Sequence, residues 1–293
     1  MKKSLDHLPE TKQQDIQTIT KLLRDVMDAF QQGKTGSRLN YRILKIILFG
    51  SHAKGSWVND PANGYVSDYD ILVIVNQPAA VEEYEVWQTA EDRIKRQVSA
   101  PLGLIVHTFR EVSSALQEGH YFFKDIREQG IELYSFDGHQ LPAAGDLTTE
   151  EQLKVASKHF SQWFESANQF FTTFKDDERR QWYKKSAFEL HQSTERFLSC
   201  VLLVCTNYLP KTHNLEHLRS LCAQQDPRFA DLFPTDNKFN RRSFQHLKRA
   251  YVDARYSEHY EITADELSWL ADEVTKLQTL TEAVCQAKID SLT

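Results

Sequence analysis

Two apolar runs that enclose a polar loop, within residues 46–75, constrain the fold of this chain more than any other stretch. The first run ends at Gly50 and Ser51, and the second begins directly after the pair Asp68 and Asp70. Short apolar runs bounded by turn residues are typical of buried strands. Alternate residues of a strand project to the same side, so the two aspartates are predicted to point together beside the Gly-Ser turn.

This arrangement suits the binding of a magnesium nucleotide. Carboxylates hold hard cations such as Mg²⁺ through oxygen, and a turn that leads into a helix offers N–H groups to phosphates. Two solvated acids at the entrance of a strand are a common alternative that needs no ligand. The hydrophobic-Gly-Ser turn that precedes the acids favours the nucleotide site.

The segment resembles the nucleotidyltransferase superfamily of the DNA polymerase beta type, and specifically the minimal nucleotidyltransferases. Their pattern is hydrophobic-Gly-Ser, a short helix, then hydrophobic-Asp-x-Asp-hydrophobic, and Gly50, Ser51, Asp68 and Asp70 match it. The resemblance implies a small mixed sheet with helices on one side. It also implies that ATP or another NTP is bound, with Gly50, Ser51 and Lys54 at the phosphates and the aspartates on Mg²⁺. The loop at 57–67 is longer than in the minimal form, and its turn formers predict a surface insertion beside the site.

The third acid of this family is missing from its expected place. Polymerase-like transfer uses a carboxylate on a neighbouring strand to hold the catalytic metal and to help deprotonate the acceptor. The strand predicted at 102–109 contains no acid. His107 is the candidate replacement as base or weak metal ligand, Glu111 is a second candidate, and a hydrogen-bonded strand histidine is the alternative. Nucleotide and Mg²⁺ binding are therefore expected, whereas catalytic turnover is left open.

The chain is predicted to contain an α/β domain at 1–140 and an all-α bundle at 147–293, joined by a linker rich in Gly and Pro. Apolar periodicity predicts a set of elements in the first domain: helices at 10–32 and 82–98, one or two helices within 112–129, and strands at 42–49, 70–75, 102–109 and 131–134. Every segment beyond the linker has helical spacing: 147–174, 179–208, 215–225, 239–256 and 264–289. Asp146 is the expected cap of the first of these helices.

Three polar clusters in the helical half, at 189–197, 210–218 and 248–260, each have the composition of a solvated helix face or a capping segment. Together they resemble the HEPN domain, a helical bundle that often accompanies minimal nucleotidyltransferases. The most specific part is Arg255-Tyr256 followed by Tyr260. The resemblance favours nucleotide or anion binding, with Arg255 on phosphate, His259 near it, and Tyr251, Tyr256 or Tyr260 available to stack on a base.

Many HEPN domains are RNases whose motif is an arginine and a histidine with four to six residues between them. Arg255 and His259 are separated by only three residues, which places both on one face if the helix continues but is shorter than the RNase pattern. HEPN domains commonly dimerise, and the aromatic residues of 147–174 exceed what one helix face usually buries. We therefore expect a homodimer, or a contact of this helix with the first domain.

The combined interpretation is a nucleotidyltransferase that moves NMP to an unknown acceptor hydroxyl on a protein, a small molecule or RNA. Its alternatives are a non-catalytic nucleotide sensor, a toxin–antitoxin-type module in which Tyr260 is nucleotidylated, and an enzyme similar to the kanamycin nucleotidyltransferases. A net charge of −6 provides no bulk attraction to nucleic acid or anionic membrane. The absence of an apolar leader or an 18-residue apolar stretch predicts a cytoplasmic protein without membrane partners. The four cysteines form no CxxC pair and are expected to be reduced core thiols.

Overall fold

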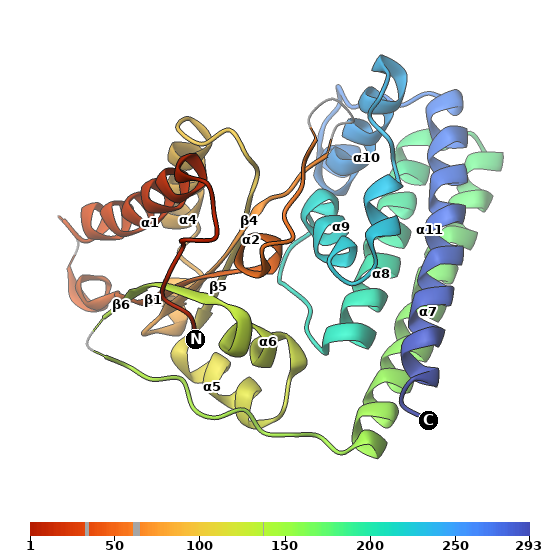
Figure 1. The fold of residues 1–293 in the computed structure, drawn as a ribbon. Helices are drawn as coiled ribbons and strands as arrows, with labels where there is room; N and C mark the ends of the chain where they lie inside the picture. The colour runs from red at the N-terminus through yellow and green to blue at the C-terminus, as the bar shows by residue number, and fades with distance from the viewer. Residues whose placement is uncertain (33–34, 61–64, 137) are drawn as a thin grey trace. The chain divides into compact units, whose positions relative to one another are not determined.

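The computed structural model of the chain describes residues 1–32, 35–60, 65–136 and 138–293 (Figure 1). The chain divides into two compact units after Asp146. The first unit holds a mixed sheet with helices, and the second, Leu147–Thr293, is helical. This order of an α/β part followed by an all-α part is the predicted one.

The sheet of the first unit has four strands in the order β5-β4-β1-β6. Their bounds are β1 Ile43–Phe49, β4 Tyr69–Val75, β5 Leu102–Thr108 and β6 Ile131–Ser135. β1 runs antiparallel to both β4 and β6, whereas β4 and β5 are parallel, so the sheet is mixed as expected. A short hairpin of β2 Asn59–Asp60 and β3 Tyr65–Val66 lies between α2 and β4.

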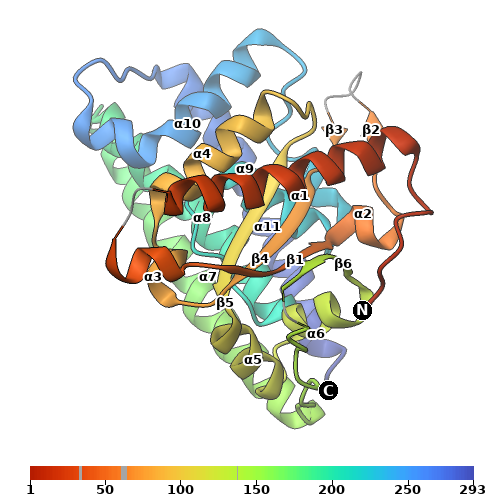
Figure 2. The same ribbon diagram turned by 90° about the vertical axis from the view of Figure 1, so that its left-hand side faces the viewer.

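Helices cover both faces of this sheet, which differs from the one-sided arrangement implied by the resemblance. α1 Glu10–Gln31 and α4 Tyr84–Lys95 lie on one face, where they share a hydrophobic core with β1 and β4 (Figure 2). α5 Phe109–Gln117 and α6 Tyr121–Gln129 lie on the other face. Every residue of β1 and β4 is buried, which explains why both read as continuous apolar runs instead of alternating ones.

Some helix boundaries differ from the predicted ones. The helix expected at 82–98 is the shorter α4, and a separate short helix, α3 Pro78–Val81, precedes it. The segment 112–129, predicted as one or two helices, forms two, α5 and α6, separated around Gly119, which has a φ of 73°. α5 begins earlier than expected because Thr108 caps it. The Thr108 hydroxyl accepts a hydrogen bond from the Glu111 N–H, and the Glu111 carboxylate accepts one from the Thr108 N–H.

The helical unit is built around α8. Its helices are α7 Thr149–Arg179, α8 Tyr183–Thr206, α9 Leu215–Ala223, α10 Lys238–Tyr256 and α11 Ala264–Asp290, with 3₁₀ turns at Gly36–Asn40 in the first unit and Pro227–Asp231 here. α8 packs against α7, α9, α10 and α11. It is apolar around most of its circumference, as a helix surrounded by others must be. Within the described residues, the five α-helices match the predicted bundle.

Two boundaries in the helical unit correct the predictions. Thr148, not Asp146, caps α7, in a capping box with Glu151. α7 continues to Arg179, and the break before α8 falls at Gln181, whose φ is 62°. The signal for this break is weak because the segment contains neither glycine nor proline.

Much of the aromatic surface of α7 is internal. Phe171 and Phe174 are buried and stack on each other, and Phe164 meets the edge of Phe197 on α8. The Ser193 hydroxyl donates to the Ala167 carbonyl at 3.0 Å and ties the same two helices together. The homodimer stays a prediction.

All four cysteines lie in the helical unit as free thiols, and the Cys200 and Cys285 sulfurs are 3.9 Å apart, well beyond disulfide length. No helix in the described part of the chain combines the length and the apolar character needed to cross a bilayer.

Candidate functional site

The turn between β1 and α2 Gly50–Lys54 brings a glycine and a serine to the end of the sheet. Gly50 has a φ of 70°, a left-handed conformation that is costly for a residue with a Cβ. Phe49 before it is still extended, so the chain turns from strand to helix within one residue. Ser51 is half-buried, and its carbonyl accepts the N–H groups of Gly55 and Ser56.

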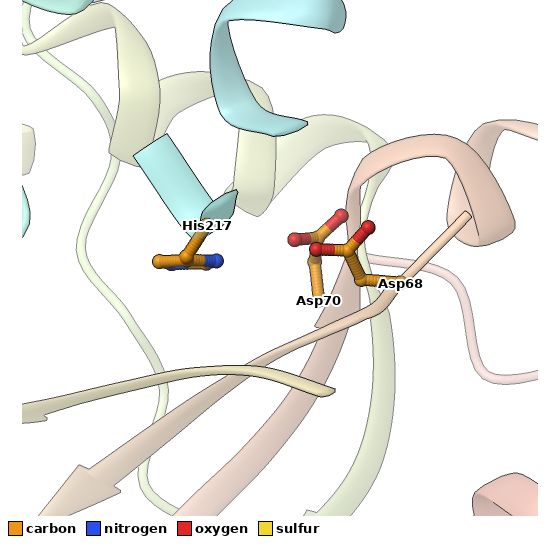
Figure 3. A group of neighbouring side chains, drawn as sticks. All are labelled: Asp68, Asp70 and His217. Atoms are coloured by element: carbon orange, nitrogen blue, oxygen red, sulfur yellow. The ribbon is translucent and has the colours of Figure 1, made fainter. Parts of the chain in front are cut away.

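The two aspartates lie beside this turn. Phe49 pairs with Asp70 in the antiparallel β1–β4 ladder, so the end of β1 meets the start of β4. Figure 3 shows the carboxylates of Asp68 and Asp70 side by side, and one oxygen of each lies within 4.8 Å of the other. Asp70 is 1% exposed and Asp68 is half-buried. His217, also labelled in Figure 3, is a residue of the helical unit.

His52 fixes the turn to the start of β4. Its Nδ1–H donates to the Asp68 carbonyl at 2.9 Å, and its ring packs on Trp57 and Tyr69. Burial, assisted by the positive charge of Lys12, lowers the pKa of His52 to about 4, so the ring is neutral near pH 7. Sequence reasoning missed His52, although its place directly after the Gly-Ser pair could have drawn attention to it.

Tyr69 anchors the same strand on the face opposite to the two aspartates. Its hydroxyl donates to the Asp15 carboxylate of α1 at 2.8 Å, and the Lys12 ammonium lies 5.1 Å from its ring centroid. Because neighbouring strand residues point to opposite faces, holding Tyr69 on the α1 side directs Asp68 and Asp70 to the other side. The predicted same-side pair of carboxylates is therefore supported by a buried tyrosine between them.

The structure does not bring His107 to the aspartates, which corrects the expectation that it replaces the third acid. Asp70 pairs with Gly103 in the parallel β4–β5 ladder, and His107 lies four residues further along, opposite Ile74. At about 3.3 Å per residue this separation is about 13 Å. His107 instead makes a 3.4 Å contact with Glu111.

Glu111, the second candidate, is the partner of Thr108 in the capping box of α5. Burial alone would raise its pKa, but hydrogen bonds from Thr108 and the neighbouring His107 lower it. The β5 residues on the face of Asp70 and nearest to it are Gly103 and Ile105. The described strand β5 therefore supplies no third carboxylate.

Two further sequence predictions concern the surroundings of the turn. Lys54 is exposed in the last turn of α2, and its predicted role at the phosphates stays a prediction. The predicted surface insertion falls partly on residues 61–64, which lie outside the described residues. Its described ends are held by hydrogen bonds between Val58 and Ser67, in both directions.

In the helical unit, Arg255 lies near the end of α10 and is exposed. Its guanidinium carbon lies 4.5–5.1 Å from the ring centroids of Phe188, Tyr251 and Tyr256. Its Nε–H donates to the Tyr251 carbonyl at 2.6 Å. Glu258 does not compete for it here, since that carboxylate contacts His259 at 3.3 Å.

Tyr251 also contacts an imidazole. The rings of His213 and Tyr251 stack with centroids 3.9 Å apart, and His213 Nδ1 donates to the Glu195 carboxylate at 2.9 Å. His213 is half-exposed, whereas Glu195 is largely buried. Three segments distant in sequence, from α8, the loop before α9, and α10, thus form one group of aromatic and charged side chains, which we call the Tyr251 cluster: Phe188, Glu195, His213, Tyr251 and Arg255.

His191 supports this cluster from the core. It is fully buried, and its Nδ1–H donates to the Leu247 carbonyl at 2.9 Å. Its other nitrogen lies 3.4 Å from the Glu195 oxygen that also accepts from His213. Burial would raise the pKa of Glu195, but the neighbouring imidazoles of His191 and His213 lower it overall. Glu195 is therefore a carboxylate shared between two imidazoles.

Two predicted residues of the helical site are placed differently from the expectation. α10 ends at Tyr256, and Ser257 is extended, so Arg255 and His259 do not share a helix face. Tyr260 is 3% exposed and its hydroxyl donates to the His246 carbonyl at 2.9 Å. Tyr260 is thus a core residue, unsuited to stacking on a base or to accepting a nucleotidyl group.

Tyr256 fits the prediction of an accessible ring, with 76% exposure. Sequence reasoning identified Arg255 and Tyr256 but did not assign Glu195 and His213 to the same group. The only sequence signal was the one-turn spacing of His191 and Glu195 on α8.

Comparison with known families agrees with the helical half of this description. The model of the HEPN domain matches residues 160–288, which include the whole Tyr251 cluster. The chain therefore carries a HEPN domain, and the match does not extend to the mixed-sheet unit. A search among curated proteins found no match.

Proposed function

We propose that the chain binds a Mg-NTP at Gly50, Ser51, Asp68 and Asp70 and transfers the NMP group to an acceptor hydroxyl. The observation that carries this proposal is the β1–β4 register, which puts a left-handed Gly-Ser turn next to two same-side carboxylates. The resemblance to minimal nucleotidyltransferases supports the same assignment.

The carboxylates suit the metal. Mg²⁺ takes oxygen ligands at about 2.0–2.1 Å and is usually held by one or two carboxylates together with substrate phosphates. Oxygens of Asp68 and Asp70 within 4.8 Å of each other can meet on one such ion after a small side-chain adjustment. A bound Mg²⁺ would neutralise triphosphate charge.

The chemistry of transfer defines what the chain must supply. The acceptor oxygen forms a bond to the α-phosphorus, the bond from that phosphorus to the β-phosphate oxygen breaks, and pyrophosphate leaves. The hydroxyl proton needs an acceptor, and Gly103 and Ile105 offer none on the described β5. That observation favours a second candidate function, a sensor that binds Mg-NTP without turning it over.

The HEPN domain is proposed to bind an anion or a nucleotide at the Tyr251 cluster. Arg255 lies over aromatic rings, which leaves guanidinium N–H groups for bidentate contact with a phosphate. Tyr256 beside it is exposed enough to stack on a base.

Melting with and without Mg-ATP tests the first site. A ligand specific for the folded state adds about 2.7 kcal/mol at one hundred times its Kd, so the melting temperature should rise. The rise should be lost in Asp68→Asn/Asp70→Asn and kept in Asp92→Asn, an exposed acid on α4. An equal rise in the double variant would place the site elsewhere.

Intact mass and ATP consumption, measured in the same incubation, separate the candidate functions. Consumed ATP with an unmodified chain supports transfer to an external acceptor. A gain of one AMP supports self-modification, at a residue other than the buried Tyr260. Unchanged ATP together with the melting shift supports the sensor.

The Tyr251 cluster is tested in the Asp68→Asn/Asp70→Asn background, which removes the first site. Arg255→Gln should weaken residual ATP binding about tenfold or more, because hydrogen bonds to charged groups contribute about 1.5–3 kcal/mol. Arg241→Gln, an exposed arginine of the same helix, is the matched control. Absence of residual binding in the background variant itself would remove the proposal for the HEPN domain.

A further inference from the structure

A cavity of the mixed-sheet unit lies along the β1–β6 edge, away from the Gly-Ser turn. Its volume is about 450 Å³, within the range of small-ligand sites. Lys45 on its wall precedes Phe49 by four residues of β1, which is about 13 Å along the strand. The polar side chains that line the cavity come from β1, α6, β6 and the segments that flank them: Lys3, Lys45, Arg127, Glu132, Ser135, His139 and Gln140.

Lys45 is an unusual residue for its position. It stands in a strand that is otherwise apolar and is 3% exposed. Lysine is almost never buried unless it is paired, and its ammonium group has three N–H donors. Glu132 accepts one of them at 2.6 Å and Ser135 another at 2.8 Å. A ligand in the cavity can take the third.

A β-bulge in β6 builds this arrangement. Ile46 pairs with Tyr134 while the next residue, Ile47, pairs with Glu132, so one residue of β6 is left out of the ladder. In a regular strand, residues three apart point to opposite faces. The bulge turns both Glu132 and Ser135 toward Lys45. Bulges that redirect a side chain in this way are found preferentially near functional sites.

The charge of the cavity is positive. Lys3, Lys45 and Arg127 stand against one carboxylate, Glu132, so the side chains sum to three minus one, or +2. Glu132 is occupied by Lys45 at 2.6 Å and by Lys3 at 3.7 Å. Arg127 of α6 is half-buried, and within the described residues no hydrogen bond or ion pair to its guanidinium occurs. A half-buried guanidinium favours a partner with oxygen acceptors.

We propose that this cavity binds the oxyanion group, phosphate or carboxylate, of a small ligand, with Arg127 as the bidentate contact and Lys45 as the donor at its wall. The proposal is independent of the nucleotide site, because neither Lys45 nor Arg127 contributes to it. Phosphate and carboxylate each present two acceptor oxygens that one guanidinium group can contact at the same time.

The test is hydrogen–deuterium exchange of peptides that cover 131–136, titrated with inorganic phosphate and, separately, with malonate at constant ionic strength. This local readout reports the β6 cavity even if either anion also binds elsewhere on the full chain. Saturable protection by at least one of the two anions is expected, and the anion that protects with the higher affinity identifies the oxyanion class. Arg127→Gln should weaken that protection about tenfold or more. Arg110→Gln, an exposed arginine of α5 that does not line the cavity, should leave it unchanged.

Two results would overturn the proposal. One is the absence of saturable protection by both phosphate and malonate. The other is protection of equal affinity in the wild type and in Arg127→Gln, which would show that the guanidinium does not contact the anion.

Discussion

Replacing Gly50 by alanine tests the turn that holds the proposed nucleotide site, and the chain offers a matched control in the same helix. Gly50 begins α2 with a φ of 70°, and Gly55 ends it with a φ of 82°. Both positions therefore need the left-handed conformation, but only Gly50 adjoins the aspartates. Gly50→Ala and Gly55→Ala should share a stability cost and differ in ligand binding.

The size of the shared cost follows from two opposing effects. A left-handed residue other than glycine costs about 1–2 kcal/mol. Alanine also restricts the unfolded chain relative to glycine, which returns about 0.4–1 kcal/mol. The difference leaves each variant with a net loss of about 0–1.6 kcal/mol of unfolding free energy, or about 0.8 kcal/mol at the midpoints of the two ranges. A Cβ at Gly55 meets the nearest atom, His7 Cδ2, at 3.6 Å, an ordinary van der Waals contact, so no clash adds to this cost.

Urea denaturation with and without Mg-ATP measures both quantities. Wild type and Gly55→Ala should gain the same free energy from saturating ligand, whereas Gly50→Ala should gain much less, because a Cβ at the turn crowds the phosphates. A full gain in Gly50→Ala would show that the triphosphate does not lie against this turn. A gain of stability in either variant would contradict the left-handed backbone.

Three further predictions concern the helical unit. Tyr260→Phe should cost about 0.5–1.5 kcal/mol in urea denaturation, since it removes the hydrogen bond to the His246 carbonyl, and should leave nucleotide affinity unchanged. Burial would raise the pKa of Glu266, but hydrogen bonds from the Thr263 N–H and Arg242 lower it below its ordinary 4.5. The stability from Glu266 is therefore present above about pH 4.5 and is lost as the pH falls through the folded-state pKa, a loss that acid titration should find smaller in Glu266→Gln. Light scattering at micromolar concentration should show a homodimer, and a strict monomer would leave the α7 aromatic residues as internal core alone.

The sequence was sufficient to predict the geometry of the Gly-Ser turn and the two aspartates because these parts are close in the chain. The Gly-Ser turn and the two aspartates are separated by fewer than twenty residues, and they flank two strands that pair with each other. The two-residue period of a strand then places Asp68 and Asp70 on one side without further information. The anchoring by His52 and Tyr69 is tertiary, and no periodicity reveals it.

His107 was misplaced for a different reason. A strand pattern identifies β5 as a strand but does not define its offset along β4, since a parallel neighbour is connected through a helical crossover and not a tight turn. Only the observed pairing of Asp70 with Gly103 shows that His107 lies too far along. The end of α10 at Tyr256, by contrast, agrees with the helix predicted at 239–256, and the extended Ser257 after it excludes the longer helix that would put Arg255 and His259 on one face.

The Gly-Ser site and the Tyr251 cluster therefore differ in what maintains them. The Gly-Ser turn and its aspartates belong to one strand pair, so their geometry should persist wherever β1 and β4 remain paired. The Tyr251 cluster draws Glu195 from α8, His213 from a loop and Arg255 from α10, and no two of these are held by local chain geometry. Its geometry depends on the packing of α10 against α8, which the buried contact between His191 and the Leu247 carbonyl fixes. Disturbing that core contact should disperse the cluster without altering any of its exposed members, whereas the aspartates of the Gly-Ser site are directed by Tyr69, the residue between them, and by its hydrogen bond to Asp15 of α1.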